Sequence, residues 1–138
     1  MAPQAAVSVE RQTNLHIQTA ERNRDVALAH LNTQAHSVQP PAYEWAAVIA
    51  FYAAVHYVNG YLWEIRRYEP PDHRSRNQLV RGDPGLQACL DEYDRLFSAS
   101  FRARYTPGFR LLEPAAREIV EAHLGKVRRV VREALGLT

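Results

Sequence analysis

The sequence predicts an all-α protein that folds as an up-and-down bundle of four or five helices. Apolar residues recur at steps of three and four positions along most of the chain, and no segment alternates apolar and polar residues as a strand does. The stretch 43–63 is apolar on nearly every side, which is typical of a helix at the centre of a bundle. Short connections between the helical patterns favour antiparallel neighbours.

The composition predicts one soluble domain in a reducing compartment. A chain of 138 residues can bury a core without cross-links, and 46% apolar with 23% charged residues is ordinary for a globular protein. The single cysteine, Cys89, cannot form an internal disulfide. No basic segment followed by an apolar run opens the chain, so we expect no secretory signal and a cytoplasmic location. The domain is expected to cover residues 9–138, after a flexible leader at 1–8 that shows no periodicity.

The first helix is predicted over residues 9–34. Its apolar stripe is weak at the start and strengthens toward Leu28 and Leu31, so we expect its N-terminal end to project past the bundle. The two prolines at 40–41 end this helix, because proline lacks the backbone N–H group and disfavours helix in the residue before it.

The central helix, predicted to end near Arg67, has only His56 as a polar residue between Trp45 and Val58. One side carries a stripe of bulky residues at three- and four-residue steps: Trp45, Val48, Ile49, Tyr52, Val55, His56 and Leu62. Another side carries a shallow ridge of small residues: Ala46, Ala50 and Ala54. A membrane span needs about 20 consecutive apolar residues. Because His56, Asn59 and Gly60 interrupt this segment, we expect a buried bundle helix and no membrane insertion.

The remaining helices are predicted over 73–81, 86–105 and from 113 to about 135. Proline and glycine in the connections between them cannot continue a helix and therefore set the boundaries. Asp72 or Ser75 can cap the short charged helix, because their side-chain oxygens accept hydrogen bonds from the first helical N–H groups.

Three motifs carry a resemblance to a known family. They are Phe51-Tyr52-Ala53-Ala54-Val55-His56, Asp72-His73-Arg74 and Ser100-Phe101-Arg102-Ala103-Arg104-Tyr105. In order and spacing they resemble the signatures of HEPN domains over about residues 42–135, with Arg104 where aspartate is more usual. The resemblance implies a four- or five-helix bundle that forms a homodimer. It further implies either a metal-independent endoribonuclease of a prokaryotic defence or toxin–antitoxin system, or a non-catalytic partner of a nucleotidyltransferase.

Catalytic members of that family carry an arginine followed four to six residues later by a histidine. The resemblance places this pair on the last helix, at Arg117 and His123. A histidine can exchange a proton with a 2′-hydroxyl, and an arginine can hold a phosphate. However, Glu118 follows the arginine, and residues six apart do not share a face of a regular helix. The alternative is an exposed arginine and a half-buried histidine. The spacing from Arg24 to His30 also fits, and we expect neither a metal nor another cofactor.

Two further groups are candidates for binding nucleic acid. Arg102, Arg104 and Arg110 alternate with aromatic residues that can stack on bases. The alternative is that these arginines pair with Asp91, Asp94 or Glu113. His73, Arg74 and Arg76 follow a rigid turn and could meet an anion, or could belong to a solvated surface helix.

Three functional hypotheses follow. The first is a HEPN-like dimer that binds or cleaves RNA, and the second is a non-catalytic module of the same fold that works through a partner protein or a larger effector complex. The third is a ligand-binding bundle whose pocket is lined by Trp45, Tyr52, His56 and Trp63. The 17 basic residues include 16 arginines and only one lysine, Lys126. This balance suits phosphate recognition, but a GC-rich genome would also produce it.

Overall fold

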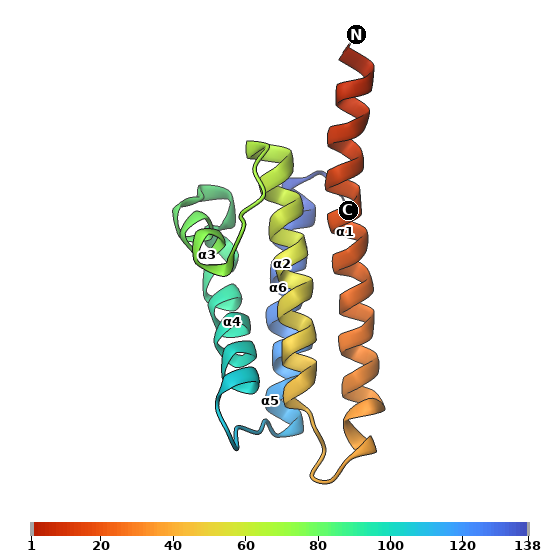
Figure 1. The fold of residues 1–138 in the computed structure, drawn as a ribbon, viewed down its shortest axis with the longest axis vertical. Coiled ribbons are helices and arrows are strands. Elements are labelled where there is room, and N and C mark those ends of the chain that lie inside the picture. The colour runs from red at the N-terminus through yellow and green to blue at the C-terminus, as the bar shows by residue number, and fades with distance from the viewer. Residues whose placement is uncertain (1, 138) are drawn as a thin grey trace.

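The computed structural model describes residues 2–137, with side chains from residue 11, and these residues form an all-α bundle. Four long helical segments run alternately down and up (Figure 1). Helix α1 (Ala2–Asn32) descends, and α2 (Glu44–Arg66) returns beside it. Helix α4 (Leu90–Tyr105) descends on the other side of α2, and α6 (Leu124–Ala134) rises behind it. The predicted fold class is therefore confirmed, and none of the described helices is long and apolar enough to cross a membrane.

Helix α1 begins earlier than the predicted start at Val9, and its N-terminal turns extend beyond the rest of the bundle, as predicted (Figure 1). The side chains of the leader predicted at 1–8 lie outside the described residues. A 3₁₀ turn, η1 (Gln34–Ser37), follows α1 and leads into the loop before α2.

The small-residue ridge of α2 is fully buried, at Ala46, Ala50 and Ala54. Close packing against α1 is most exacting at Gly60, where a Cβ atom would lie 3.0 Å from Cδ1 of Ile17 and 3.3 Å from Cβ of His16. The central helix is not covered on every side, however. Trp45 is 46% exposed, and Tyr52 and His56 are partly exposed. These residues combine an apolar ring with a polar atom, so they can occupy a position between core and water.

Helix α3 (His73–Gly82) is seen nearly end-on in Figure 1, across the direction of the long helices. Asp72 caps it by accepting a hydrogen bond of 2.8 Å from the N–H group of Ser75. The next segment begins as a 3₁₀ helix, η2 (Pro84–Cys89), so α4 starts at Leu90 and not at the predicted position 86. The buried carboxylate of Asp83 caps η2 by accepting a 2.8 Å hydrogen bond from the N–H group of Gly85.

The last helical segment is interrupted where the sequence predicts one regular helix. It consists of α5 (Glu113–Arg117), a π-helical turn η3 (Glu118–His123) and α6. A π turn is wider than an α turn and is often found at functional sites. Buried residues from all three parts hold the segment against α2 and α4: Ala116, Ile119, Val120, Leu124, Val127 and Val131.

Candidate functional site

The two residues predicted to form a catalytic pair on the last helix have separate partners. Arg117 forms ion pairs with Glu113 at 3.0 Å and Glu121 at 3.1 Å, and hydrogen bonds to these carboxylates raise the pKa of its guanidinium. The side chain of His123 is 13% exposed, and its Nε2 lies 3.8 Å from a carboxylate oxygen of Glu118. Arg117 is thus occupied on both sides by acids, and its role in catalysis stays a prediction.

The other arginine–histidine spacing, on the first helix, is explained by a structural contact. Nε2 of His30 lies 2.9 Å from the carbonyl oxygen of Ala42 and can donate a hydrogen bond to it. This contact joins the end of α1 to the loop before α2. His30 therefore has a role in positioning that loop.

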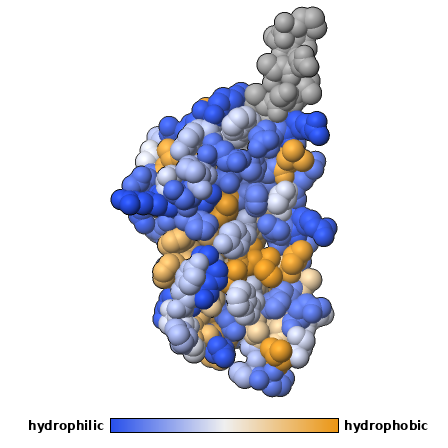
Figure 2. Space-filling model, in the orientation of Figure 1, coloured by the Kyte–Doolittle hydropathy of each residue, from blue (hydrophilic) through white to orange (hydrophobic). Residues whose placement is uncertain are grey.

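A continuous set of aromatic rings surrounds Arg104 where α2, α3 and α4 meet. We call this set the aromatic–arginine face; it comprises Tyr52, His73, Phe97, Phe101, Arg104 and Tyr105. The guanidinium of Arg104 lies 5.7 Å from the ring centre of Tyr52 and 4.9 Å from that of Tyr105. Its Nη1 also donates a 3.2 Å hydrogen bond to the Tyr52 hydroxyl. Figure 2 shows apolar side chains, in orange, at the surface over the part of the molecule where α2 and α1 lie in Figure 1. The tyrosines, His73 and Arg104 of the aromatic–arginine face are hydrophilic on this colour scale.

The arginines near the end of α4 do not pair with the acids that the sequence offered as partners. Asp94 is bound by Arg81 at 3.0 Å, and Glu113 is bound by Arg117. Within the described part of the chain, Arg104 forms no ion pair. Arg102 and Arg110 also form no ion pair within this part of the chain. The guanidinium of Arg102 lies 4.8 Å from the ring centre of Phe109, and Arg110 donates a hydrogen bond to the carbonyl oxygen of Phe109.

Of the predicted anion-binding group His73, Arg74 and Arg76, one residue is buried, one is partly buried and one is exposed. Arg76 is only 6% exposed, and it donates hydrogen bonds to Oδ1 of Asn59 at 3.0 Å and to Nδ1 of His73 at 2.9 Å. Burial, followed by the charges of Arg76 and Arg104, lowers the pKa of His73. His73 lies on the aromatic–arginine face, and the buried Arg76 holds it there through its hydrogen bond to Nδ1. Arg74 is exposed.

A histidine chain that sequence reasoning missed lies beside this face. Nε2 of His16 is 2.5 Å from Oε1 of Glu69, and Nδ1 of His16 is 3.1 Å from Nδ1 of His56. Burial, followed by the charges of His16 and Arg76, lowers the pKa of His56, while Glu69 acts in the opposite direction. The sequence placed His56 in the bulky stripe of the central helix. It carried no signal for His16, which is 40 residues away.

The distance between its two tryptophans excludes the ligand pocket that was predicted along the central helix. Trp45 and Trp63 are separated by roughly 27 Å along α2 at 1.5 Å per residue, so they cannot line one small-molecule pocket together.

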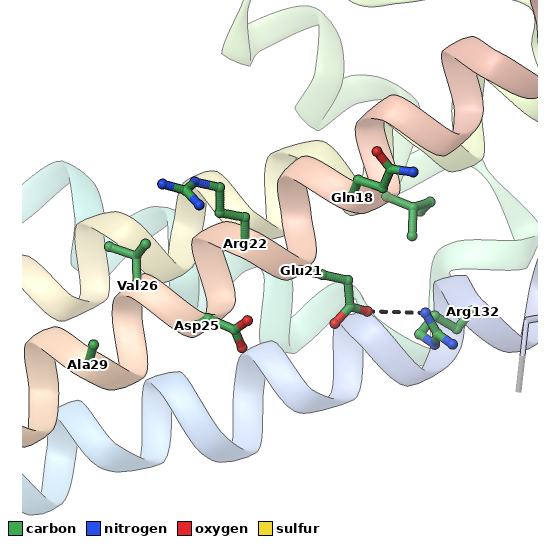
Figure 3. Close-up of a pocket in the computed structure, with 8 residues that line it drawn as sticks. Gln18, Glu21, Arg22, Asp25, Val26, Ala29 and Arg132 are labelled. Carbon is green, nitrogen blue, oxygen red and sulfur yellow. Dashed lines mark hydrogen bonds and ion pairs between the residues drawn. The ribbon is translucent and has the colours of Figure 1, made fainter.

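A groove of about 700 Å³ instead lies between α1 and α6 (Figure 3). Glu21 accepts hydrogen bonds from Arg128 at 2.9 Å and from Arg132 at 3.1 Å. Figure 3 shows Glu21 and Asp25 directed toward α6, whereas Arg22 points away from it. Acids and arginines are mixed in this groove, so it lacks the single sign of charge that favours an anion.

No group of three or more potential metal ligands is found among the described residues. No protein-family model and no curated protein matches the chain. The likeness to HEPN domains therefore rests on the three motifs and on the kind of fold, and membership of that family stays a prediction.

Proposed function

We propose that this protein binds single-stranded RNA on the aromatic–arginine face and acts in the cytoplasm within a prokaryotic defence or toxin system. The observation that carries the proposal is the state of Arg104. Its guanidinium lies between Tyr52 and Tyr105 and has no carboxylate partner among the described residues. Nε of Arg104 donates to the carbonyl oxygen of Ser100 at 3.3 Å, and its Nη1 donates to the hydroxyls of Tyr52 and Tyr105. Its Nη2 is therefore the group available to donate hydrogen bonds to a phosphate.

The rings beside Arg104 supply the second part of a single-strand binding site. Phe101 is 49% exposed and Tyr105 is 62% exposed, with their ring centres 5.0 Å apart. Exposed aromatic rings stack on unpaired bases, and neighbouring arginines contact the backbone that joins those bases. The positions of Arg102 and Arg110 on the same end of α4 and the following loop extend the positive charge.

Fluorescence anisotropy with a labelled single-stranded RNA of about 12 nucleotides tests the proposal. Loss of one stacking ring costs about 1–3 kcal/mol, so Phe101→Ala should raise Kd by about 5- to 150-fold. Arg104→Gln should reduce the slope of log K against log salt by about 0.7, the value for one phosphate contact on a single strand. Arg22→Gln on α1 is the matched control and should leave both values unchanged.

If the wild-type protein does not bind RNA at low salt, or if Phe101→Ala and Arg104→Gln bind as Arg22→Gln does, the proposal is wrong. Both substituted side chains are partly exposed, so circular dichroism should show an unchanged helical fold and separate loss of binding from unfolding.

We further propose that the bound RNA is cleaved without a metal ion. The test is incubation of RNA with protein in EDTA, followed by comparison with His123→Ala and Arg117→Gln. Loss of cleavage in these variants, with RNA binding retained, would support the pair predicted on the last helix. Cleavage that is unchanged in both would place the reacting groups elsewhere.

The second candidate function is that of a non-catalytic module that binds another protein, such as a nucleotidyltransferase or a component of an effector complex. It is supported by large apolar side chains at the surface, notably Trp45 at 46% and Leu112 at 78% exposure. Absence of both RNA binding and cleavage, together with a stable complex formed with the product of a neighbouring gene, would favour this function.

We also propose a homodimer. Helix α1 carries Leu15 at 49% and Val26 at 42% exposure, and a second copy of the chain could cover these apolar side chains. Light scattering at micromolar concentration should give twice the chain mass of 15.7 kDa, and a monomer would contradict the proposal.

A further inference from the structure

The histidine chain joins three segments that are distant in sequence. His16 lies on α1, His56 on α2, and Glu69 in the connection to α3. The links are 2.5 Å from Glu69 to His16 and 3.1 Å from His16 to His56. The amide nitrogen of Gln12 also approaches the same carboxylate oxygen, at 3.3 Å. Close packing of α1 on α2 at Gly60 brings His16 within reach of His56.

The hydrogen bonds of the histidine chain determine which ring nitrogens of His16 and His56 carry a hydrogen. An ionised carboxylate only accepts hydrogen bonds, so Nε2 of His16 carries the hydrogen that it donates to Glu69. In the neutral ring, Nδ1 of His16 is then an acceptor, and the hydrogen between the two rings belongs to Nδ1 of His56. His56 is consequently left with an unprotonated Nε2. Among the side chains described, this nitrogen has no hydrogen-bond partner.

His56, the end of the histidine chain whose Nε2 has no partner, lies next to the aromatic–arginine face. His56 follows Tyr52 by one helical turn on α2, about 6 Å along the helix, and Tyr52 is hydrogen-bonded to Arg104. His56 is partly exposed, whereas His16 is buried. A strand of RNA held by Arg104 and the rings around it would therefore pass the exposed histidine and not the buried one.

We infer that Glu69, His16 and His56 form a proton relay whose outer end, Nε2 of His56, is the general base for the 2′-hydroxyl of the bound RNA. This inference rests on the proposed RNA binding. A carboxylate behind an imidazole fixes its tautomer and stabilises the imidazolium that forms when it takes a proton. In this chain the positive charge can move one ring inward, to His16, where Glu69 is in direct contact.

The reaction that such a relay supports is cleavage by internal transfer. Nε2 of His56 takes the proton of the 2′-hydroxyl, and the oxygen attacks the adjacent phosphorus atom. The bond from phosphorus to the 5′ oxygen breaks, and that oxygen takes a proton from water. The relay then returns its proton to the resulting hydroxide. The products are a 2′,3′-cyclic phosphate and a 5′-hydroxyl, and no net water, metal ion or oxidant is consumed.

The electrostatic surroundings of His56 suit a base that is free at neutral pH. Burial, His16 on α1 and Arg76 on α3 lower its pKa, and Glu69 raises it. Cleavage should therefore increase with pH up to neutrality, as the base loses its proton. Replacing Glu69 by glutamine removes the influence that raises the pKa, so the acidic limb of the pH–rate profile should move to lower pH.

The first experiment compares cleavage and binding in EDTA for wild type, His56→Ala and Glu69→Gln. Loss of a general base costs about 100-fold or more, so His56→Ala should lose cleavage to that extent while Kd for RNA is unchanged. Glu69→Gln should cleave more slowly than wild type at neutral pH, because His56 is then a weaker base, and its acidic limb should lie at lower pH. His36→Asn and Glu64→Gln serve as matched controls, since neither residue belongs to the histidine chain formed by Glu69, His16 and His56. A substrate with one 2′-O-methyl group should resist cleavage at that position.

The second experiment follows the imidazole nitrogens by NMR without RNA. The relay predicts that Nε2 of His16 and Nδ1 of His56 carry hydrogens and that the other two ring nitrogens do not. Glu69→Gln should disturb this pattern, whereas Glu64→Gln should leave it unchanged. This measurement also shows whether the variants are folded. The opposite tautomer of either ring in the wild-type protein would overturn the relay.

The outcomes separate the two proposals. RNA binding without cleavage in EDTA, or cleavage by His56→Ala at the wild-type rate, overturns the relay as the base but leaves the binding proposal standing. Absence of RNA binding overturns the proposed function itself, and with it the action of the relay on RNA.

Discussion

Replacing the buried acid Asp83 by alanine should destabilise the protein by about 2–4 kcal/mol. Asp83 is 2% exposed, and it accepts 2.8 Å hydrogen bonds from the Tyr61 hydroxyl and the N–H group of Gly85. Loss of the helix cap costs about 1 kcal/mol, and a buried hydroxyl left without its partner costs about 1–3 kcal/mol. Arg66 also contacts Asp83, but its side chain is 43% exposed and can return to water, so it adds little.

Urea denaturation monitored by circular dichroism gives the free energy of unfolding for this comparison. In a thermal unfolding experiment, a loss of about 1 kcal/mol lowers Tm by about 3–5 °C for a chain of this size. The Tm of Asp83→Ala should therefore be roughly 10 °C below that of the wild type. Asp94→Ala is the matched control, because its ion pair with Arg81 is largely exposed and should contribute less than about 1 kcal/mol. Equal losses for Asp83→Ala and Asp94→Ala would refute the argument that burial decides the difference.

Three further perturbations test the packing and the charges. Burial alone would raise the pKa of Glu21, but Arg128 and Arg132 lower it overall. The ion pairs therefore stabilise the fold above the ordinary carboxyl pKa, and unfolding curves should show that Glu21→Gln weakens the loss of stability between roughly pH 5 and 3. Cys89 is fully buried, and burial raises its pKa to about 11, so a thiol reagent should label it only after unfolding. Gly60→Val should cost about 1–3 kcal/mol in the same denaturation assay, because the added carbons overlap α1.

The helices could be predicted because each depends on local pattern. The small ridge of α2 is buried, the proline and glycine breaks lie between helices, and Asp72 caps α3 as its residue type favours. The η2 and η3 turns were not predicted from the sequence, and for η2 the reason is a tertiary contact. Asp83 shapes η2 through Tyr61, which comes from a different helix.

Less of the aromatic–arginine face and of the histidine chain could be predicted from the sequence. Arg104 and Phe101 stood out because arginine and aromatic residues alternate there. Whether Arg104 pairs with Asp94 depends on which way both helices face, and only the structure shows that Arg81 takes that acid. The histidine chain depends on contacts between residues 40 and 53 positions apart, and a single sequence contains no pattern that reports such contacts.

The most direct test of RNA recognition on the aromatic–arginine face is an NMR titration of the ¹⁵N-labelled protein with single-stranded RNA. The account predicts that amide signals from the second half of α4, the start of α3 and the Tyr52–His56 turn of α2 shift together as RNA is added. Signals from the α1–α6 groove should stay in place. Shifts confined to that groove or to the last helix, or no shifts at all, would contradict it.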